Sequence, residues 1–328
     1  MTWLTWRQYR VQAAVAALVL AVFATVLLVT GFQLAAQWHT VLAACTASGT
    51  CDNLHQGAVS LGSALGWDFV VLSLLAPALF GVLVGAPLVA HEFEARTCDF
   101  AWAQSITRTR WLAVKVGWLL LAAAACGGAL AALTTWWSGP SNAISAGAFS
   151  PGQFDTQGIV PIGYAVFAMA LGIAAGTVAR RTLPAIAVAL GGFIALRLVI
   201  SDFLRPHYIT AVTTYYNVTG SFTPRGQAWV LSQGAVSKAG VVVASGWGDL
   251  YPALPASCQK LLPAAGGGKG ASLTAVFSCM KAHGWRGFVT YQPSYRYWPF
   301  QGIETGIYVL LAAALIGVTF LIVRRRDA

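Results

Sequence analysis

The stretch GIETGIYVLLAAALIGVTFLIV, residues 302–323, decides the fold class of this chain. It holds one charged side chain, Glu304, near its start, and the basic run Arg324–Arg326 follows it directly. A helix needs about 20 apolar residues to cross a hydrocarbon core of about 30 Å, so this stretch is long enough to span a bilayer. It predicts a membrane-spanning helix with basic residues at its C-terminal end.

Five further apolar stretches precede it, at 11–36, 67–90, 112–136, 159–179 and 184–203. The composition agrees, because 57% of the residues are hydrophobic and 9% are charged, whereas soluble domains carry about 25% charged residues. The first stretch exceeds the about 7–15 apolar residues of a signal peptide, so we interpret it as a span. We expect an all-α polytopic membrane protein with six transmembrane helices.

The basic residues predict the orientation of these helices. Loops 37–66 and 137–158 contain no Lys or Arg. Short cytoplasmic loops carry an excess of these residues, so both loops are expected outside the cell and both termini in the cytoplasm. The expected cytoplasmic anchors are Arg7, Arg10, Arg96, Arg108, Arg110, Lys115, Arg180, Arg181, Arg324, Arg325 and Arg326.

Between the fifth and sixth helices, residues 205–301 predict a β-rich extracellular domain. Its runs Tyr208–Phe222, Val241–Val243 and Gly287–Tyr297 are rich in β-branched and aromatic residues, which favour strands. Pro252–Pro263 and Gly266–Gly270 are interpreted as loops. The expected order is a cytoplasmic interfacial segment (1–10), five helices (11–204), the extracellular domain (205–301), and the sixth helix with a basic tail (302–328).

The cysteines are compatible with an oxidising outer compartment. Cys45 and Cys51 share the first outer loop, and Cys258 and Cys279 share the extracellular domain, so each pair could form a disulfide. The alternative is that they are buried, unpaired apolar residues. No metal site is expected, because no CxxC or HxxxH pair occurs.

Arg197 is the one charged residue well inside a predicted span. Such a side chain costs about 2.5–3.5 kcal/mol on insertion scales, so it needs a partner or a function. It could pair with Asp202 or an acid outside the span, or face a translocation cavity, and the sequence leaves these alternatives open. Asp68, Asp202 and Glu304 are expected at outer helix ends, within reach of water.

The segment 91–115, HEFEARTCDFAWAQSITRTRWLAVK, is the densest ionisable cluster of the chain. Its acids, bases and interleaved aromatic residues suit contact with a protein partner. They also fit an amphipathic helix at the membrane surface. Spacings of Gly-xxx-Gly at 81/85, 172/176 and 302/306 allow close helix packing but do not by themselves establish a dimer.

This segment carries a family resemblance, in Glu92, Glu94, Thr97, Trp102, Gln104, Ser105, Ile106, Thr107, Arg108, Arg110, Trp111, Leu112 and Lys115. Together with Trp6–Arg10 and the six-helix layout, it resembles permease subunits of bacterial ATP-binding-cassette (ABC) transporters of the type-2 exporter class. Many relatives carry glycine where Arg96 stands, and their last outer loop is shorter.

The resemblance implies a permease of the bacterial inner membrane that exports a hydrophobic or amphipathic compound. It also implies a homodimer bound to an ABC ATPase subunit. ATP and Mg²⁺ would lie on that ATPase, with no cofactor and no catalysis in this chain. The implied docking residues are Glu92, Glu94, Arg96, Arg108 and Arg110.

The other partner expected is membrane lipid. Nucleic acid is not expected, because no Lys/Arg-rich helix stands free of the membrane. An alternative function is a membrane-anchored sensor or assembly factor that acts through its extracellular domain.

Overall fold

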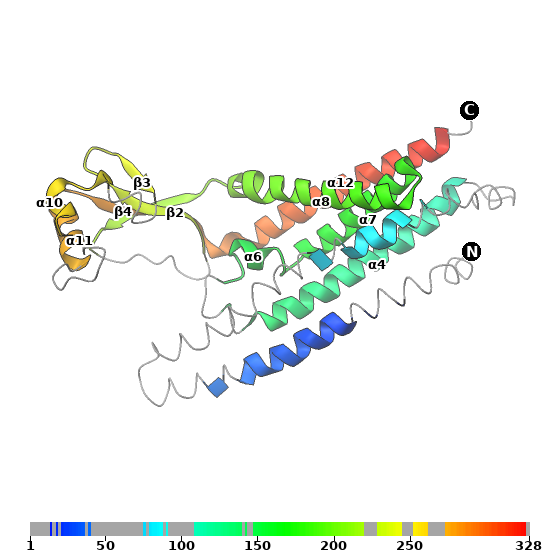
Figure 1. Ribbon diagram of the computed structural model, residues 1–328, viewed down its shortest axis with the longest axis horizontal. Helices are drawn as coiled ribbons and strands as arrows, with labels where there is room; N and C mark the ends of the chain where they lie inside the picture. The colour runs from blue at the N-terminus through cyan, green and yellow to red at the C-terminus, as the bar shows by residue number, and fades with distance from the viewer. Residues whose placement is uncertain are drawn as a thin grey trace. The chain divides into compact units, whose positions relative to one another are not determined.

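The computed structural model describes residues 14, 18, 21–36, 39–40, 75–76, 79–87, 90, 108–139, 142, 147–219, 228–244, 252–261 and 273–325. The chain divides into two compact units, drawn in Figure 1. The helical unit comprises Met1–Arg205 and Trp298–Ala328, and the sheet unit comprises Pro206–Tyr297.

Among the described residues, four helices are long and apolar enough to cross a membrane: Leu112–Trp137, Val160–Ala179, Thr182–His207 and Ser294–Arg325. They contain α4 (Arg108–Trp137), α7 (Val160–Ala179), α8 (Thr182–Leu198) and α12 (Tyr297–Arg325). These helices confirm the last four predicted apolar stretches as candidate spans.

The first two predicted stretches are described only in part. Residues 21–36 form a shorter apolar helix, and residues 79–87 are helical. Apart from residues 14, 18, 75–76 and 90, the remainder of both stretches lies outside the described residues. The chain is therefore mostly helical with four candidate spans, while the total of six and the orientation stay predictions.

Helix α7 is the most buried of the four candidate spans and packs closely on the short helix that precedes α4. A Cβ on Gly85 would lie 2.9 Å from the α7 backbone, and one on Gly176 would lie 2.6 Å from the carbonyl oxygen of Ala86. Such an approach needs residues without a side chain. The Gly81/Gly85 and Gly172/Gly176 pairs thus face each other within one chain.

The sheet unit contains an antiparallel four-stranded sheet in the order β1-β4-β2-β3. Its strands are β1 (Val212–Asn217), β2 (Trp229–Val236), β3 (Val242–Ala244) and β4 (Arg286–Gln292). Three of them lie in the runs predicted as strands, but β2 was not predicted. Its sequence includes Ser232, Gln233 and Gly234, which weaken the strand pattern.

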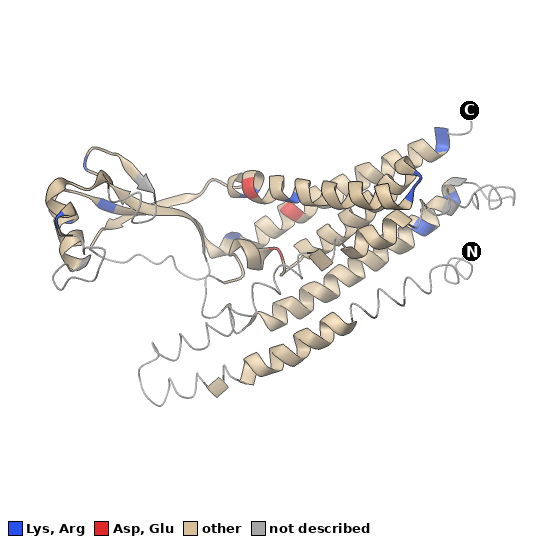
Figure 2. Cartoon of the chain, viewed as in Figure 1, with Lys and Arg blue, Asp and Glu red and all other residues tan. Residues whose placement is uncertain are grey.

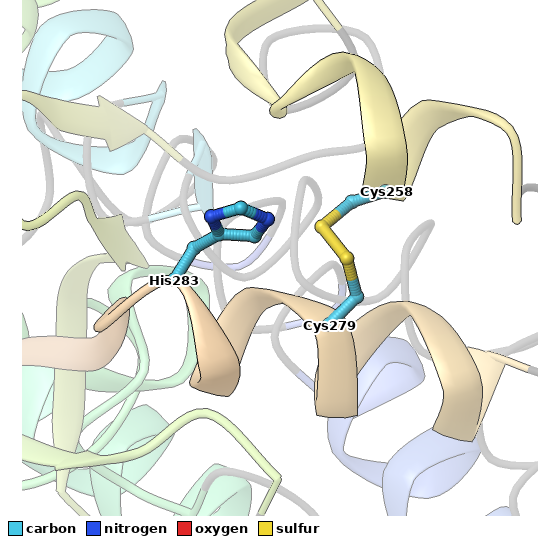
Figure 3. A group of neighbouring side chains, drawn as sticks. All are labelled: Cys258, Cys279 and His283. Carbon is cyan, nitrogen blue, oxygen red and sulfur yellow. A yellow bond between two sulfur atoms is a disulfide. The ribbon is translucent and has the colours of Figure 1, made fainter.

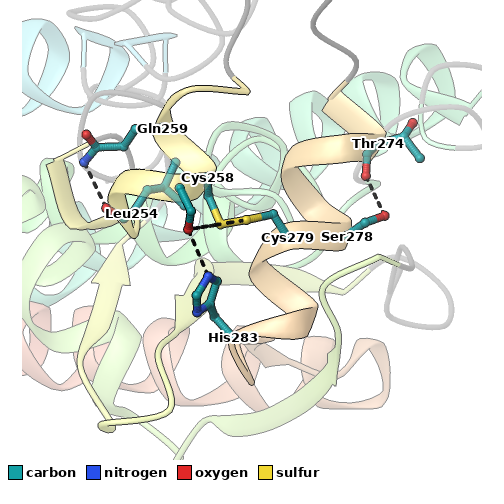
Figure 4. The surroundings of a disulfide bond; sticks show 8 residues. Leu254, Cys258, Gln259, Thr274, Ser278, Cys279 and His283 are labelled. Atoms are coloured by element: carbon teal, nitrogen blue, oxygen red, sulfur yellow. Dashed lines mark hydrogen bonds between the residues drawn. A yellow bond between two sulfur atoms is a disulfide. The ribbon is translucent and has the colours of Figure 1, made fainter.

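Two α-helices within the described residues also belong to the sheet unit, which is therefore mixed rather than simply β-rich. The helix α10 (Ala256–Gln259) lies where a loop was predicted, and α11 (Leu273–Ala282) packs against it. Proline breaks strands but is tolerated at a helix start, and Pro255 stands directly before α10. A Cys258–Cys279 disulfide joins the two helices (Figure 4).

Candidate functional site

A cluster of ionisable residues is buried inside the helical unit. It consists of Asp155, Tyr164, Arg197, Arg205 and Glu304, which we call the charge cluster. Figure 2 shows how few charged positions the described helices carry between their ends. Buried charges are expensive in an apolar bundle, so this group is the strongest candidate for a function.

Asp155 enters the cluster from the connection between two helices. The short α6 (Pro151–Phe154) ends with Asp155 as its C-terminal cap. Gly158 then turns the chain into α7 with φ +70°, a value that glycine adopts without strain. The carboxylate is thereby held beside the first turns of α7, where Tyr164 lies.

Gln301 on α12 fixes this connection in place. Its Oε1 accepts hydrogen bonds from the backbone N–H groups of Ile159 and Val160, both at 2.9 Å. Its Nε2 donates to the carbonyl oxygens of Phe154 at 3.0 Å and Gln157 at 3.2 Å. One buried side chain thus satisfies the start of α7 and joins it to α12.

A π-helical turn at Val199–Leu204 follows α8 and aligns the two arginines. In a regular α-helix, residues eight apart differ by about 80° in direction, because eight steps of about 100° exceed two turns. A π turn inserts one extra residue, which reduces the difference to about 20°. Arg197 and Arg205 therefore both reach Asp155.

Arg205 makes most of the ionic contacts in the cluster. Its Nε donates to Glu304 Oε2 at 2.8 Å and its Nη2 donates to Glu304 Oε1 at 2.7 Å, while Nη2 also donates to Asp155 Oδ1. Arg197 Nη2 lies 2.7 Å from Asp155 Oδ2. The Arg205 side chain is 2% exposed and that of Glu304 is 0% exposed.

The charges of the cluster are balanced when both acids are ionised, since two guanidinium groups face two carboxylates. Burial of ions is tolerated only with such pairing and with further hydrogen bonds. Aromatic rings supply more contact: the Arg197 guanidinium lies 4.8 Å from the centre of the Tyr164 ring, and that of Arg205 lies 4.7 Å from the centre of the Phe154 ring.

Three buried polar atoms have no hydrogen-bond partner among the described residues: Arg197 Nη1, Thr305 Oγ1 and Tyr308 Oη. The Tyr308 ring packs edge-on against Tyr164, with centroids 4.8 Å apart. An unsatisfied buried group costs about 1–3 kcal/mol. Two of these atoms, Arg197 Nη1 and Tyr308 Oη, therefore leave hydrogen-bonding capacity unused in and beside the charge cluster.

The structure gives Arg197 a partner outside its own span. Asp155 was not named by sequence reasoning, although it is the one acid of loop 137–158 and could have been found on that ground. Asp202 is exposed, and its Oδ1 accepts a hydrogen bond from Ser201 Oγ at 3.1 Å. No Arg197–Asp202 ion pair occurs among the described side chains.

The expectation that water reaches Glu304 was wrong. This side chain is fully buried, because Arg205 forms two hydrogen bonds to it and the Tyr164 hydroxyl lies against it. Sequence analysis placed Arg205 at the start of the predicted extracellular domain, 205–301, and assigned it no partner. The position of Arg205 beside Asp155 depends on the π turn at Val199–Leu204, which no sequence pattern predicted.

The predicted ATPase-docking residues are mostly outside the described part of the chain. Glu92, Glu94 and Arg96 are not described, whereas Arg108 is the first residue of α4 and Arg110 is exposed in its first turn. The docking role stays a prediction.

In the sheet unit, Cys258, Cys279 and His283 lie together (Figure 3). The two sulfur atoms are bonded to each other and so lack the thiolate form that binds metals. His283 Nε2 lies 3.0 Å from Ser257 Oγ (Figure 4). Cys45 and Cys51 lie outside the described residues, so their pairing stays a prediction.

Apolar helices of spanning length with buried charges at the ends of three of them define a multi-pass membrane protein. Residues 17–205, more than half of the chain, match the family described as ABC-2 membrane transporter related. The chain belongs to this family. No curated protein and no solved structure matches it.

Proposed function

We propose that this chain is the permease subunit of an ABC transporter that exports a hydrophobic or amphipathic compound from a bacterial cell. Two copies would form the pore in the inner membrane, each with six spans, cytoplasmic termini and residues 205–301 outside. A separate ATPase chain would supply the energy. The observation that carries the proposal is the family match over 17–205, which includes segment 91–115.

The arrangement of α4 supports a mechanical role for this segment. The helix begins at Arg108, inside the segment, and its 30 residues extend about 45 Å, which exceeds the thickness of a hydrocarbon core. It packs along α7, which carries Tyr164. A displacement applied to the start of α4 would therefore reach the charge cluster through two rigid, packed helices.

The charge cluster suits a transporter because it joins the ends of three spans without a covalent bond. Alternating access requires span ends that separate and close again. Arg205, at the end of the α8 span, pairs with Glu304 near the start of α12 and with Asp155 before α7. We infer that this end of the pore closes through the cluster and opens when its ion pairs part.

The first test is to purify the chain from its native membrane in mild detergent and to measure ATP hydrolysis in the eluate. A stoichiometric co-purifying ATPase would support the permease function. Its absence, under conditions where the permease stays dimeric, would contradict the proposal and favour a sensor or assembly factor.

The second test addresses the docking residues. Glu92→Lys combined with Glu94→Lys is expected to release the ATPase while membrane insertion stays intact, because two acids of the docking surface become basic. Asp202→Lys is the control. Asp202 is exposed and follows the C-terminal end of α8, whereas Arg181, an expected cytoplasmic anchor, precedes its N-terminal end. Undiminished ATPase binding by the double variant would show that these acids do not dock the partner.

A further inference from the structure

The sheet unit carries a strong excess of positive charge. Residues 206–297 hold seven Lys or Arg side chains and one acid, Asp249. Figure 2 shows blue positions gathered at the α10–α11 end of this unit and no red position on its described part. The cations at this end are Lys238, Lys260, Lys281 and Arg286, which we call the basic tip.

Pairing and packing bring three of these side chains to one place. Arg286 is the first residue of β4 and pairs with Val236 of β2, and Lys238 follows two residues later in the turn after β2. The Lys238 side chain packs over Gly284, since a Cβ there would lie 3.4 Å from its Cδ. The N–H of Gly284 donates to the carbonyl oxygen of Lys281 at 2.9 Å, where α11 ends. The three cations therefore surround one turn of the chain.

Lys260 joins this group through α10. The Cys258–Cys279 disulfide bonds α10 to α11, and Ser257 Oγ of α10 lies 3.0 Å from Nε2 of His283, which follows α11 (Figure 4). Ser257 and Lys260 are three residues apart, so they share one side of a helical turn. Lys260 thus lies on the side of α10 that faces the end of α11.

The charges of the basic tip are not neutralised within the described structure. All four side chains are exposed, and none forms an ion pair with a described residue. By contrast, Arg296 beyond the other end of β4 donates to Gln292 Oε1 at 2.7 Å. Lys281 stands in the last turn of α11, where a cation interacts favourably with the helix dipole. That role does not explain Lys238 and Arg286, which lie on a turn and a strand.

We propose that the basic tip binds a linear phosphate polymer other than a nucleic acid. Lysine is depleted in protein interfaces but binds phosphate well as a point charge, and three of the four cations are lysines. A chain of phosphates neutralises several neighbouring cations at once. Single-stranded nucleic-acid sites add aromatic rings that stack on bases. The exposed aromatic residues of the described sheet unit, Tyr215 and Tyr295, are not in the tip.

The position of the tip within the sheet unit favours a free polymer over the phosphates of a lipid surface. The unit begins at Pro206 and ends at Tyr297, and both chain ends adjoin the paired residues Val212 and Tyr291. The tip lies at the opposite ends of these strands, and the seven residues of β4 extend about 23 Å. The inference concerns the sheet unit alone and does not depend on the transport function or on an ATPase.

Binding of inorganic polyphosphate to the full-length chain in neutral detergent tests the proposal. Combining Lys238→Gln, Lys281→Gln and Arg286→Gln should weaken binding about tenfold or more and lower the slope of log Kd against log salt by about 2, since each phosphate contact contributes about 0.7. The charge-conserving set Lys238→Arg, Lys281→Arg and Arg286→Lys should bind like the unmodified chain.

A second control separates the tip from the net charge of the chain. Arg324→Gln with Arg325→Gln removes exposed cations at the end of α12 and should leave binding unchanged. An equal loss in this variant would overturn the assignment to the tip. If the triple variant did not fold, the unmodified chain would still decide, because no binding, or binding that is independent of salt, would contradict the proposal.

Three further probes test the class of partner: vesicles of phosphatidylglycerol and phosphatidylcholine, polyglutamate, and a single-stranded oligodeoxynucleotide of the same charge. Polyphosphate should bind more tightly than each of them. A preference for the vesicles would identify a lipid surface, a preference for polyglutamate an acidic protein, and a preference for the oligonucleotide contacts to bases. Any of these three results would overturn the proposal.

Discussion

Each of the two units is stabilised internally by a different kind of bond. In the sheet unit, a disulfide joins Cys258 to Cys279, which are 21 residues apart. In the helical unit, ion pairs join Arg205 to residues 50 and 99 positions away, Asp155 and Glu304. The disulfide acts over a short stretch and is permanent under oxidising conditions. The ion pairs connect segments that are distant in sequence, and they can separate without any covalent bond being broken.

This difference separates a unit that keeps its shape from one that can change it. A disulfide lowers the conformational entropy of the unfolded chain, and its strength does not depend on burial away from water. A buried ion pair is stable only while its neighbours stay packed around it, since each ion alone would cost several kcal/mol. The cluster therefore responds to movement of α7, α8 or α12, and the disulfide does not.

The largest effect is expected when the cluster loses its central cation. Arg205→Met keeps much of the side-chain volume but leaves Asp155 and Glu304 without their shared partner. Breaking a buried ion pair by removing one member costs about 3–5 kcal/mol. The variant should show a large drop in melting temperature and in folded yield from the membrane.

The control for this variant is Arg181→Met, which removes an exposed arginine at the start of the α8 span. It should melt within a few degrees of the unmodified chain. Equal melting of the two variants would mean that the cluster adds nothing to the stability of the helical unit.

A smaller effect is expected from loss of the disulfide. Replacing Cys258 and Cys279 by alanine should destabilise the sheet unit by about 3 kcal/mol, the loop-entropy value for a closed loop of this size. Hydrogen exchange of the full chain should speed up in α11 and β4 while α7 keeps its protection. Cys126→Ala, at the unpaired cysteine of α4, is the control. Unchanged exchange in α11 would contradict a stabilising role for the bond.

Close helix packing predicts that two glycine-to-alanine substitutions change the stability in opposite directions. Gly176→Ala places a Cβ against the Ala86 carbonyl oxygen, so the helices must shift, at a cost of about 1–3 kcal/mol. Gly191→Ala in α8 meets open space and should stabilise the helix by about 0.5–1 kcal/mol. Thermal unfolding of both variants measures the difference. A stabilised Gly176→Ala would show that α7 and its neighbour are not in close contact.

Sequence reasoning predicted the four described spans because each is a long apolar run, a property of neighbouring residues. It predicted three of the four strands from runs of β-branched and aromatic residues, which are also a property of neighbouring residues. It did not find Asp155 as the partner of Arg197 or Arg205 as the partner of Glu304, because pairing across 42 and 99 positions depends on the fold. The π turn and the Gly158 bend that bring these residues together have no pattern in the sequence.

Asp202 illustrates how proximity in sequence can suggest the wrong partner. Its substitution gives the smallest expected change in stability. Near Arg197 in sequence, it was a natural candidate partner, yet its side chain is exposed and contacts Ser201. Asp202→Asn should therefore change stability by no more than about 0.5 kcal/mol. Asp155→Asn should cost far more, because it weakens the pairing of two buried guanidinium groups. Melting curves of the two variants show whether Asp155 or Asp202 is the ion-pair partner of Arg197. If Asp202→Asn were the more damaging, Arg197 would pair within its own span rather than with Asp155, and the long-range ion pairs of the helical unit would be those of Arg205 alone.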